Sequence, residues 1–330
     1  MKIFFEKEEK LIFEILFFCN SLNCGSIDKI DFEKFVKIAS SHQLLPAIYS
    51  NLLKNDSLKL IPSDLNRFLK EIYKLNKDRN LIMKNEIDEI KMILNNSKIP
   101  FAIVKGAKLI NLESEYFSYE RMIGDIDILI EKNNLKKSFN LLLNKGYSYK
   151  KPITQIWKKR HMPKLVNKNK VFAVELHKYL IRNERKYDLE SDFFNNSNDH
   201  ISTDLNIRYL ILNDQINDYN YLNARINFKA LYDFYCMKKN KINLNYFDNK
   251  YCKHFFLITN EIGITDLELE ISVYNKLFIM RYNLKRKYAL YLKLDRFICK
   301  IIELLPIRLI QLIEIFFNKE YRKYVMNRLK

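Results

Sequence analysis

The spacing of hydrophobic residues divides the chain into three regions. Up to residue 96 the hydrophobic positions recur every three or four residues, most clearly from Leu65 to Leu94, and this spacing predicts helices. Residues 97–200 change to short hydrophobic runs typical of strands, and after residue 200 the helical spacing returns. We therefore predict a helical region at 1–96, an α/β core at 97–200 and a second helical region at 201–330.

Three hydrophobic runs in the middle region have the length and composition of strands. They cover Phe101–Val104, Ile126–Ile130 and Val171–Leu176, and a helical stretch at Asn134–Asn144 separates the last two. The predicted fold class is therefore α+β, with a small mixed β-sheet flanked by N-terminal and C-terminal helices.

Glycine is scarce, and its positions point to one part of the chain. Only five glycines occur in 330 residues, and Gly106, Gly124 and Gly146 fall within 41 of them. In such a chain, a glycine is expected where the backbone needs a positive φ or approaches a ligand closely. Gly146 follows a helical stretch and is explained by a helix C-cap. Gly106 and Gly124 therefore mark the candidate site.

Acidic residues occupy alternate positions in two of the predicted strands. A strand over Gly124–Ile130 would place Asp125 and Asp127 on one face, and Glu175 and His177 would share a face of the third run. Neighbouring carboxylates repel each other unless a cation lies between them, and a hard divalent ion such as Mg²⁺ prefers oxygen ligands. Asp125, Asp127 and Glu175 could thus hold one or two metal ions that assist a phosphoryl displacement.

An Asp-x-Asp pair alone is more often a solvated strand face, so the neighbouring residues decide its interpretation. Lys105 and Gly106 follow the first predicted strand and lead into a helical stretch, where phosphate can bind backbone N–H groups. Arg121 stands four residues before Asp125 in a chain where arginine is much rarer than lysine. Both cations are therefore expected near the acidic pair.

Taken together, these residues resemble a known family, the uncharacterised bacterial nucleotidyltransferases of the DNA polymerase β superfamily. The pattern is Lys-Gly, then Arg-x-x-Gly-Asp-x-Asp, then Glu-x-His, and the similarity covers roughly residues 30–240. The segments that carry it are Val104–Gly106, Arg121–Leu129, Leu143–Tyr147 and Val174–His177, with helical flanks at Ser41–Pro46 and Ala230–Asp233.

The resemblance implies transfer of a nucleoside monophosphate from a triphosphate such as ATP to a hydroxyl acceptor. It implies that Asp125 and Asp127 bind Mg²⁺ or Mn²⁺ with the triphosphate, and that Glu175 is a third metal-binding and catalytic carboxylate near the acceptor. The wider superfamily has Gly-Ser or Gly-Gly where this chain and its nearer relatives have Lys-Gly. The candidate nucleotide-binding residues are Lys105, Gly106, Arg121, Gly124, His177, Arg225, Lys229 and Asp233.

Some of these candidates have structural explanations as well. A histidine at the end of a strand, such as His177, is more often a packed structural residue. Arg225, Lys229 and Asp233 recur every four residues on a predicted helix, and an ordinary ladder of i, i+4 ion pairs explains this spacing.

Charge is concentrated at the end of the chain. Residues 281–330 carry thirteen Lys and Arg against four acidic residues, a net +9 out of +18 for the whole chain. Their hydrophobic runs at Ile301–Leu305 and Leu309–Phe317 could lie on an anionic membrane surface or bind an RNA. A closing bundle helix and the lysine-rich composition produced by an AT-rich genome explain the same features without a polyanionic partner.

Composition also indicates a location. Five cysteines without a Cys-x-x-Cys pair indicate reduced thiols in a cytoplasm. The acidic first nineteen residues predict a helix and no export signal. The most hydrophobic stretch, Ile301–Phe317, contains charged residues and Pro306, so no transmembrane segment is expected. We expect a cytoplasmic protein, with peripheral contact at the inner membrane surface as an alternative.

Two classes of function stay open at this level. The leading one is the Mg²⁺-dependent nucleotidyltransferase, and the other is a non-catalytic nucleotide- or RNA-binding module with the same fold. Clustered carboxylates favour the transferase, because negative charge beside phosphate gives a pure binding protein no advantage. Small molecules, a protein hydroxyl, a tRNA end and a lipid-linked glycan all fit as acceptor.

Overall fold

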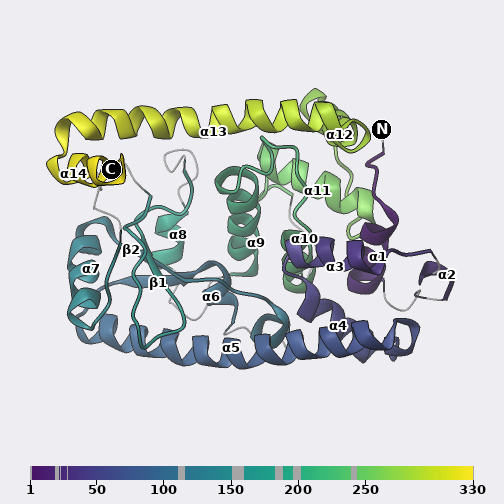
Figure 1. The fold of residues 1–330 in the computed structure, drawn as a ribbon, viewed down its shortest axis with the longest axis horizontal. Helices are drawn as coiled ribbons and strands as arrows, with labels where there is room; N and C mark the ends of the chain where they lie inside the picture. Colours follow the sequence, from purple (N-terminus) through teal and green to yellow (C-terminus); the bar gives the residue numbers. More distant parts are fainter. Residues whose placement is uncertain are drawn as a thin grey trace.

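The computed structural model describes residues 2–18, 22, 24–27, 29–110, 116–150, 160–182, 189–195, 202–238 and 244–329. The N-terminal part is helical, as predicted. Its helices are α1 (Lys7–Phe17), α2 (Cys24–Ile27), α3 (Phe32–Ser41), α4 (Leu45–Lys54) and α5 (Ser63–Asn96). The 34-residue α5 runs along one long edge of the molecule (Figure 1).

The middle of the chain forms a three-stranded mixed sheet, which confirms the predicted α+β class. Strand β1 (Phe101–Val104) is antiparallel to β2 (Ile126–Ile130), and β2 is parallel to β3 (Val174–His177). Helix α6 (Lys105–Leu109) follows β1, and α7 (Leu135–Asn144) follows β2. The third strand begins at Val174 and not at Val171 as predicted, because pairing with β2 begins where Val174 meets Ile126.

The alternation of side chains gives the sheet two buried faces. Ile126, Ile128 and Ile130 of β2 belong to a hydrophobic cluster with α5 and α7. Leu129 belongs to a second cluster with residues of helix α9 (Thr203–Leu212). Because Asp127 has the same parity as Leu129 along the strand, it lies on the α9 side of the sheet. This side of the sheet carries the candidate site.

Helices return after residue 189 of the chain, about ten residues before the position that the spacing predicted. Helix α8 (Glu190–Asn195) precedes α9, and a π-helical turn at Asn213–Asn217 follows it. The remaining helices are α10 (Phe228–Met237), α11 (Lys250–Ile262), α12 (Val273–Lys287), α13 (Ala289–Phe317) and α14 (Lys319–Leu329). Helix α13 runs along the long edge opposite α5, and the sheet and α9 lie between the two (Figure 1).

The N-terminal and C-terminal helices share one hydrophobic core. The rings of Phe13 and Phe228 are 4.6 Å apart, and His42 stacks on Phe228 at 4.2 Å. The division at residues 96 and 200 stays a prediction, and this shared core ties its first and third regions together. Within the described part of the chain, no helix is both long and apolar enough to cross a membrane.

Candidate active site

The site is built beside α9, where β1 ends and β2 and β3 begin. Lys105 follows β1 directly and has a φ of 55°, a left-handed conformation that is unusual for a residue other than glycine. Its Nζ lies 2.7 Å from Oδ1 of Asp127 on the neighbouring strand. The backbone turn after β1 therefore directs a cation to the central carboxylate of the sheet.

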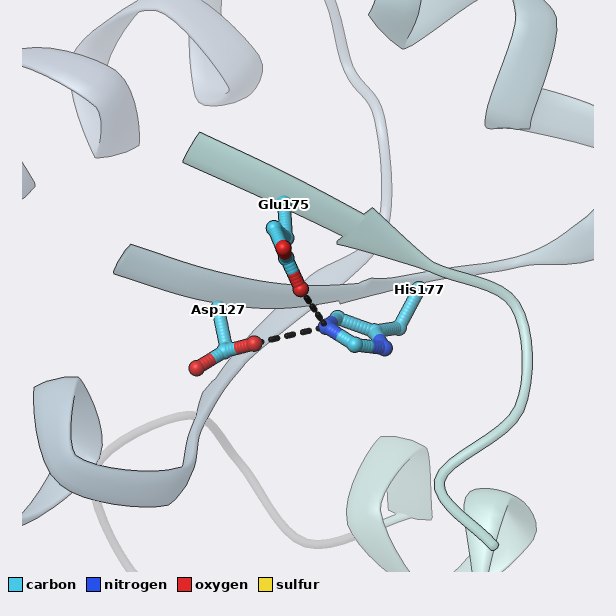
Figure 2. A group of neighbouring side chains, drawn as sticks. All are labelled: Asp127, Glu175 and His177. Atoms are coloured by element: carbon cyan, nitrogen blue, oxygen red, sulfur yellow. Dashed lines mark hydrogen bonds and ion pairs between the residues drawn. The ribbon is translucent and has the colours of Figure 1, made fainter. Parts of the chain in front are cut away.

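Asp127 and Glu175 are direct partners in the register of the parallel pair β2 and β3. Oδ1 of Asp127 lies 2.7 Å from Nε2 of His177, and Oε2 of Glu175 lies 3.6 Å from the same nitrogen. Figure 2 shows the three side chains converging on one point. Their nearest ligand atoms all lie within 4.8 Å of one another, so the group is able to hold a metal ion.

The protonation states of Asp127 and His177 follow from their surroundings. Burial opposes ionisation of Asp127, but His177 and Lys105 outweigh it and lower the pKa of this carboxyl to about 2. Burial lowers the pKa of His177 to about 4, against the opposing effect of Asp127. At neutral pH a neutral His177 therefore donates a hydrogen bond from Nε2 to an ionised Asp127.

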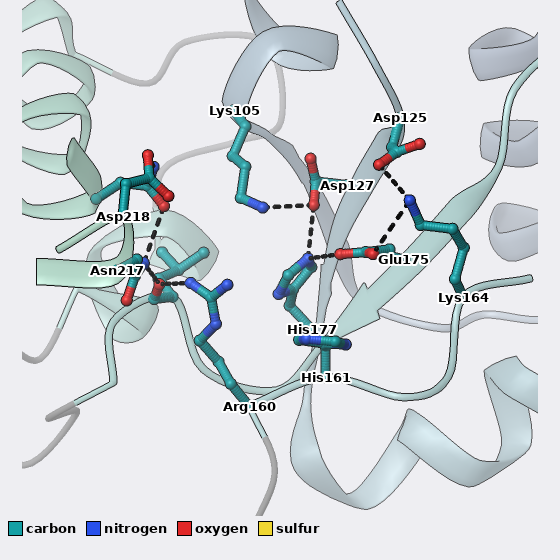
Figure 3. Close-up of polar contacts among 12 residues, drawn as sticks. Lys105, Asp125, Asp127, Arg160, His161, Lys164, Glu175, His177, Asn217 and Asp218 are labelled. Atoms are coloured by element: carbon teal, nitrogen blue, oxygen red, sulfur yellow. Dashed lines mark hydrogen bonds and ion pairs between the residues drawn. The ribbon is translucent and has the colours of Figure 1, made fainter. Parts of the chain in front are cut away.

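Asp125 directly precedes β2, which begins at Ile126. Its Oδ2 is 2.6 Å from Nζ of Lys164, and the same ammonium lies 3.6 Å from Oε1 of Glu175. Figure 3 shows Lys164 placed between these two carboxylates. Although burial opposes the charge, the two carboxylates raise the pKa of Lys164. Lys164 thus neutralises part of the acidic cluster.

Arg121 connects the site to the C-terminal helices. Its Nε and Nη2 donate to Oδ1 and Oδ2 of Asp233 on α10 at 2.9 and 2.8 Å. A Cβ on Gly106 would lie 2.3 Å from Nη1 of Arg121 and 3.0 Å from a methyl group of Ile123. The close approach of the guanidinium therefore explains the glycine at position 106. Backbone conformation does not, because the positive φ belongs to the preceding residue, Lys105.

A cavity of about 230 Å³ adjoins these residues. Most of the candidate residues lie around it. Those that line it are Lys105, Gly106, Arg121, Gly124, Asp125, Asp127 and Lys229. Glu175 and His177 contact Asp127 from the adjacent strand, and Asp233 lies behind Arg121.

Two expectations about the helix after the core are wrong. Arg225 precedes α10 and lines a different cavity, with His42 and Arg286. The ladder of i, i+4 ion pairs is replaced by longer-range contacts, because Asp233 pairs with Arg121 and Lys229 donates a hydrogen bond to the carbonyl of Met122 at 2.7 Å. Burial and the charge of Arg121 lower the pKa of Lys229 to about 7.

Sequence reasoning missed several residues of the site. Lys164 is one, because a single lysine in a lysine-rich chain carries no signal. Arg160 and Asp218 both lie on the side of His177 that faces away from Lys164 (Figure 3), and Nη1 of Arg160 donates to the carbonyl of Leu180 at 2.9 Å. Asn206, Tyr209 and Asn213 line the cavity. The polar run at 213–218 was a visible signal, but such runs usually indicate exposed loops.

Comparison with known protein families identifies a match over most of the chain. Residues 28–250 match a protein family described as uncharacterised nucleotidyltransferase. This range includes the three strands and every residue that lines the cavity. No curated protein and no solved structure matches the chain.

Proposed function

Because the chain belongs to the family of uncharacterised nucleotidyltransferases, we propose that it transfers a nucleoside monophosphate from a nucleoside triphosphate to a hydroxyl acceptor. The observation that carries this proposal is the pairing of Asp127 with Glu175 on adjacent strands, with Asp125 and Asp127 lining the cavity. This arrangement supports membership of the DNA polymerase β superfamily. The acceptor is a small molecule, a protein, a tRNA or a lipid-linked glycan.

Asp125, Asp127 and Glu175 would hold a divalent ion. The donors fit Mg²⁺ or Mn²⁺, because hard ions prefer carboxylate oxygens and Asp127 is ionised although buried. When bound, the ion would supply positive charge next to the phosphate oxygens.

The protein's own groups have separate roles in this proposal. The acceptor oxygen forms a bond to the α-phosphorus while the bond from that phosphorus to the β-phosphate oxygen breaks, and pyrophosphate leaves. Glu175 accepts the proton of the attacking hydroxyl. Lys105 binds the triphosphate, and Arg121 presents Nη1, since its Nε and Nη2 donate to Asp233. Catalysis is mostly positioning and charge stabilisation, as in other phosphoryl transfers.

A transfer assay tests the proposal. Purified protein is incubated with each α-³²P-labelled nucleoside triphosphate, Mg²⁺ or Mn²⁺, and fractionated cell extract. We expect label to move into one acceptor fraction, and Asp127→Asn and Glu175→Gln to reduce the rate at least about a thousandfold. The matched control is Glu131→Gln, an exposed carboxylate one residue beyond β2.

Two outcomes would contradict the proposal. An Asp127→Asn variant with the wild-type rate would show that the acidic cluster is not catalytic. Metal-dependent nucleotide binding without transfer to any fraction would favour the non-catalytic binding module.

A further inference from the structure

Helix α13 (Ala289–Phe317) carries a continuous row of exposed apolar side chains. The row recurs at intervals of three or four residues, which places its members on one face of the helix. Leu290, Phe297 and Phe316 are 80, 64 and 72% exposed, and the row includes Leu294, Ile301 and Leu305. The helix is about 43 Å long at 1.5 Å per residue. Large apolar surfaces of this kind indicate a binding face.

Of the four acidic residues in 281–330, only Glu320 is exposed. Asp295 is buried and pairs with Arg281 at 2.7 Å and Lys285 at 3.3 Å. Glu303 accepts a hydrogen bond from an asparagine side chain, and Glu314 is buried and does the same. Asp295 is therefore neutralised by two cations, and Glu303 and Glu314 are at least half-buried.

Most cationic side chains of residues 281–330 are exposed to solvent. Lys287, Lys293, Lys300, Arg308, Lys319 and Lys323 are exposed, and none of them forms an ion pair with another residue in the described part of the chain. The apolar row of α13 is thus bordered by cations whose charge is available to a partner.

The apolar row and the exposed cations together favour one of three partners: a second copy of the chain, an RNA or a lipid bilayer. A second copy of the chain would bring two segments of net +9 together, and their repulsion opposes such a contact. An RNA would pair with the cations and leave the apolar row in water. An anionic bilayer surface takes both, because lipid headgroups attract the cations while apolar side chains enter the boundary of the acyl region.

We propose that α13 and its flanking basic residues bind the surface of an anionic lipid bilayer. The helix lies on the surface and does not cross it, since no described helix is apolar enough to span a membrane. This inference is independent of the proposed transfer reaction.

Vesicle co-sedimentation of the full chain tests the inference. The vesicles are phosphatidylcholine alone or phosphatidylcholine with 30% phosphatidylglycerol, at low and physiological salt. We expect binding to the anionic vesicles, weakened by salt, and little binding to the neutral ones. A Leu290→Ser, Phe297→Ser, Phe316→Ser triple variant should bind about a hundredfold more weakly, because these rings and chains no longer enter the lipid.

Matched variants on α5 serve as controls. Leu75→Ser, Leu81→Ser and Met92→Ser remove exposed apolar side chains from the opposite edge, and circular dichroism checks that all variants fold. For charge, Lys293→Glu, Lys300→Glu and Arg308→Glu are compared with Lys70→Glu, Lys74→Glu and Lys84→Glu on α5.

The inference is supported if only the α13 variants lose binding. Equal losses in the charge-reversal variants of α5 and α13 would show that net charge alone drives binding and would overturn it. A wild-type protein that does not bind anionic vesicles would also overturn the inference. A dimer in light scattering that the α13 apolar variant dissociates would assign the row to a second copy instead.

Discussion

The guanidinium of Arg121 and the carboxylate of Asp233 form a two-point ion pair across 112 residues of sequence. Asp233 is 1% exposed and also accepts a hydrogen bond from the hydroxyl of Tyr116 at 2.5 Å. The pair fixes α10 against the loop that leads to Asp125 and Asp127. The C-terminal helical region is therefore part of the frame of the site.

Breaking this pair should destabilise the protein strongly. Asp233→Asn leaves the buried charge of Arg121 without a counterion, so we expect a loss of about 3–5 kcal/mol in the free energy of unfolding. Urea denaturation measures it. The double variant Arg121→Met, Asp233→Leu should lose less than Asp233→Asn alone, because no uncompensated charge stays buried. With the single variants Arg121→Met and Asp233→Leu completing the cycle, additive losses in the double variant would contradict a direct coupling.

The two glycines of the site should respond differently to alanine. In Gly106→Ala the new Cβ meets Arg121 and Ile123, and we expect a loss of about 1–3 kcal/mol in the free energy of unfolding. Gly124→Ala is the matched control, since nothing lies within 4 Å of its added Cβ. Thermal unfolding should show a lower midpoint for the first variant only. A transfer defect in a stable Gly124→Ala protein would support close approach of the nucleotide there.

Removal of the Lys164 charge should strengthen divalent metal binding. Lys164 lies 2.6 Å from Asp125 and 3.6 Å from Glu175, where it competes with any other cation. In Lys164→Met we expect affinity for Mn²⁺ to rise about tenfold, because a neighbouring repulsive charge is lost. Isothermal titration calorimetry measures this, with the exposed Lys168→Met as control. Unchanged or weaker binding would show that Lys164 does not compete for these carboxylates.

His254 should make stability depend on pH. Its ring is fully buried against Phe278, Nε2 has no hydrogen-bond partner among the described residues, and burial lowers its pKa to about 4. The unfolded chain, with a pKa near 6.5, takes up the proton first. The contribution of the neutral His254 ring to the free energy of unfolding is therefore present above pH 6.5 and is lost as the pH falls toward 4.

A variant isolates this contribution. Between pH 7 and pH 5 the free energy of unfolding should fall in both proteins. The fall should be about 2 kcal/mol smaller in His254→Phe than in wild type. Denaturant unfolding at both pH values measures the difference, and the exposed Tyr274→Phe should behave as wild type. An identical pH dependence in His254→Phe and wild type would mean that the buried ring does not resist protonation.

The sequence by itself determined the local features of this protein. Helical spacing identified α5 and the helices after residue 200, and short apolar runs identified β1 and β2, because side-chain period reports which face of an element is buried. The alternation in β2 placed Asp127 and Leu129 on one side of the strand. Gly146 was correctly explained as a residue that ends a helix, with a φ of 86° after α7.

Tertiary structure decided which distant residues meet. The register of Asp127 with Glu175 depends on the order and direction of the strands, which local spacing does not encode. The partners Asp233 and Lys164 come from segments that pack on the sheet only in the folded chain. Arg225 was misplaced for a different reason. A period of four residues indicates a shared helix face only where the helix continues, and α10 begins after Arg225, at Phe228.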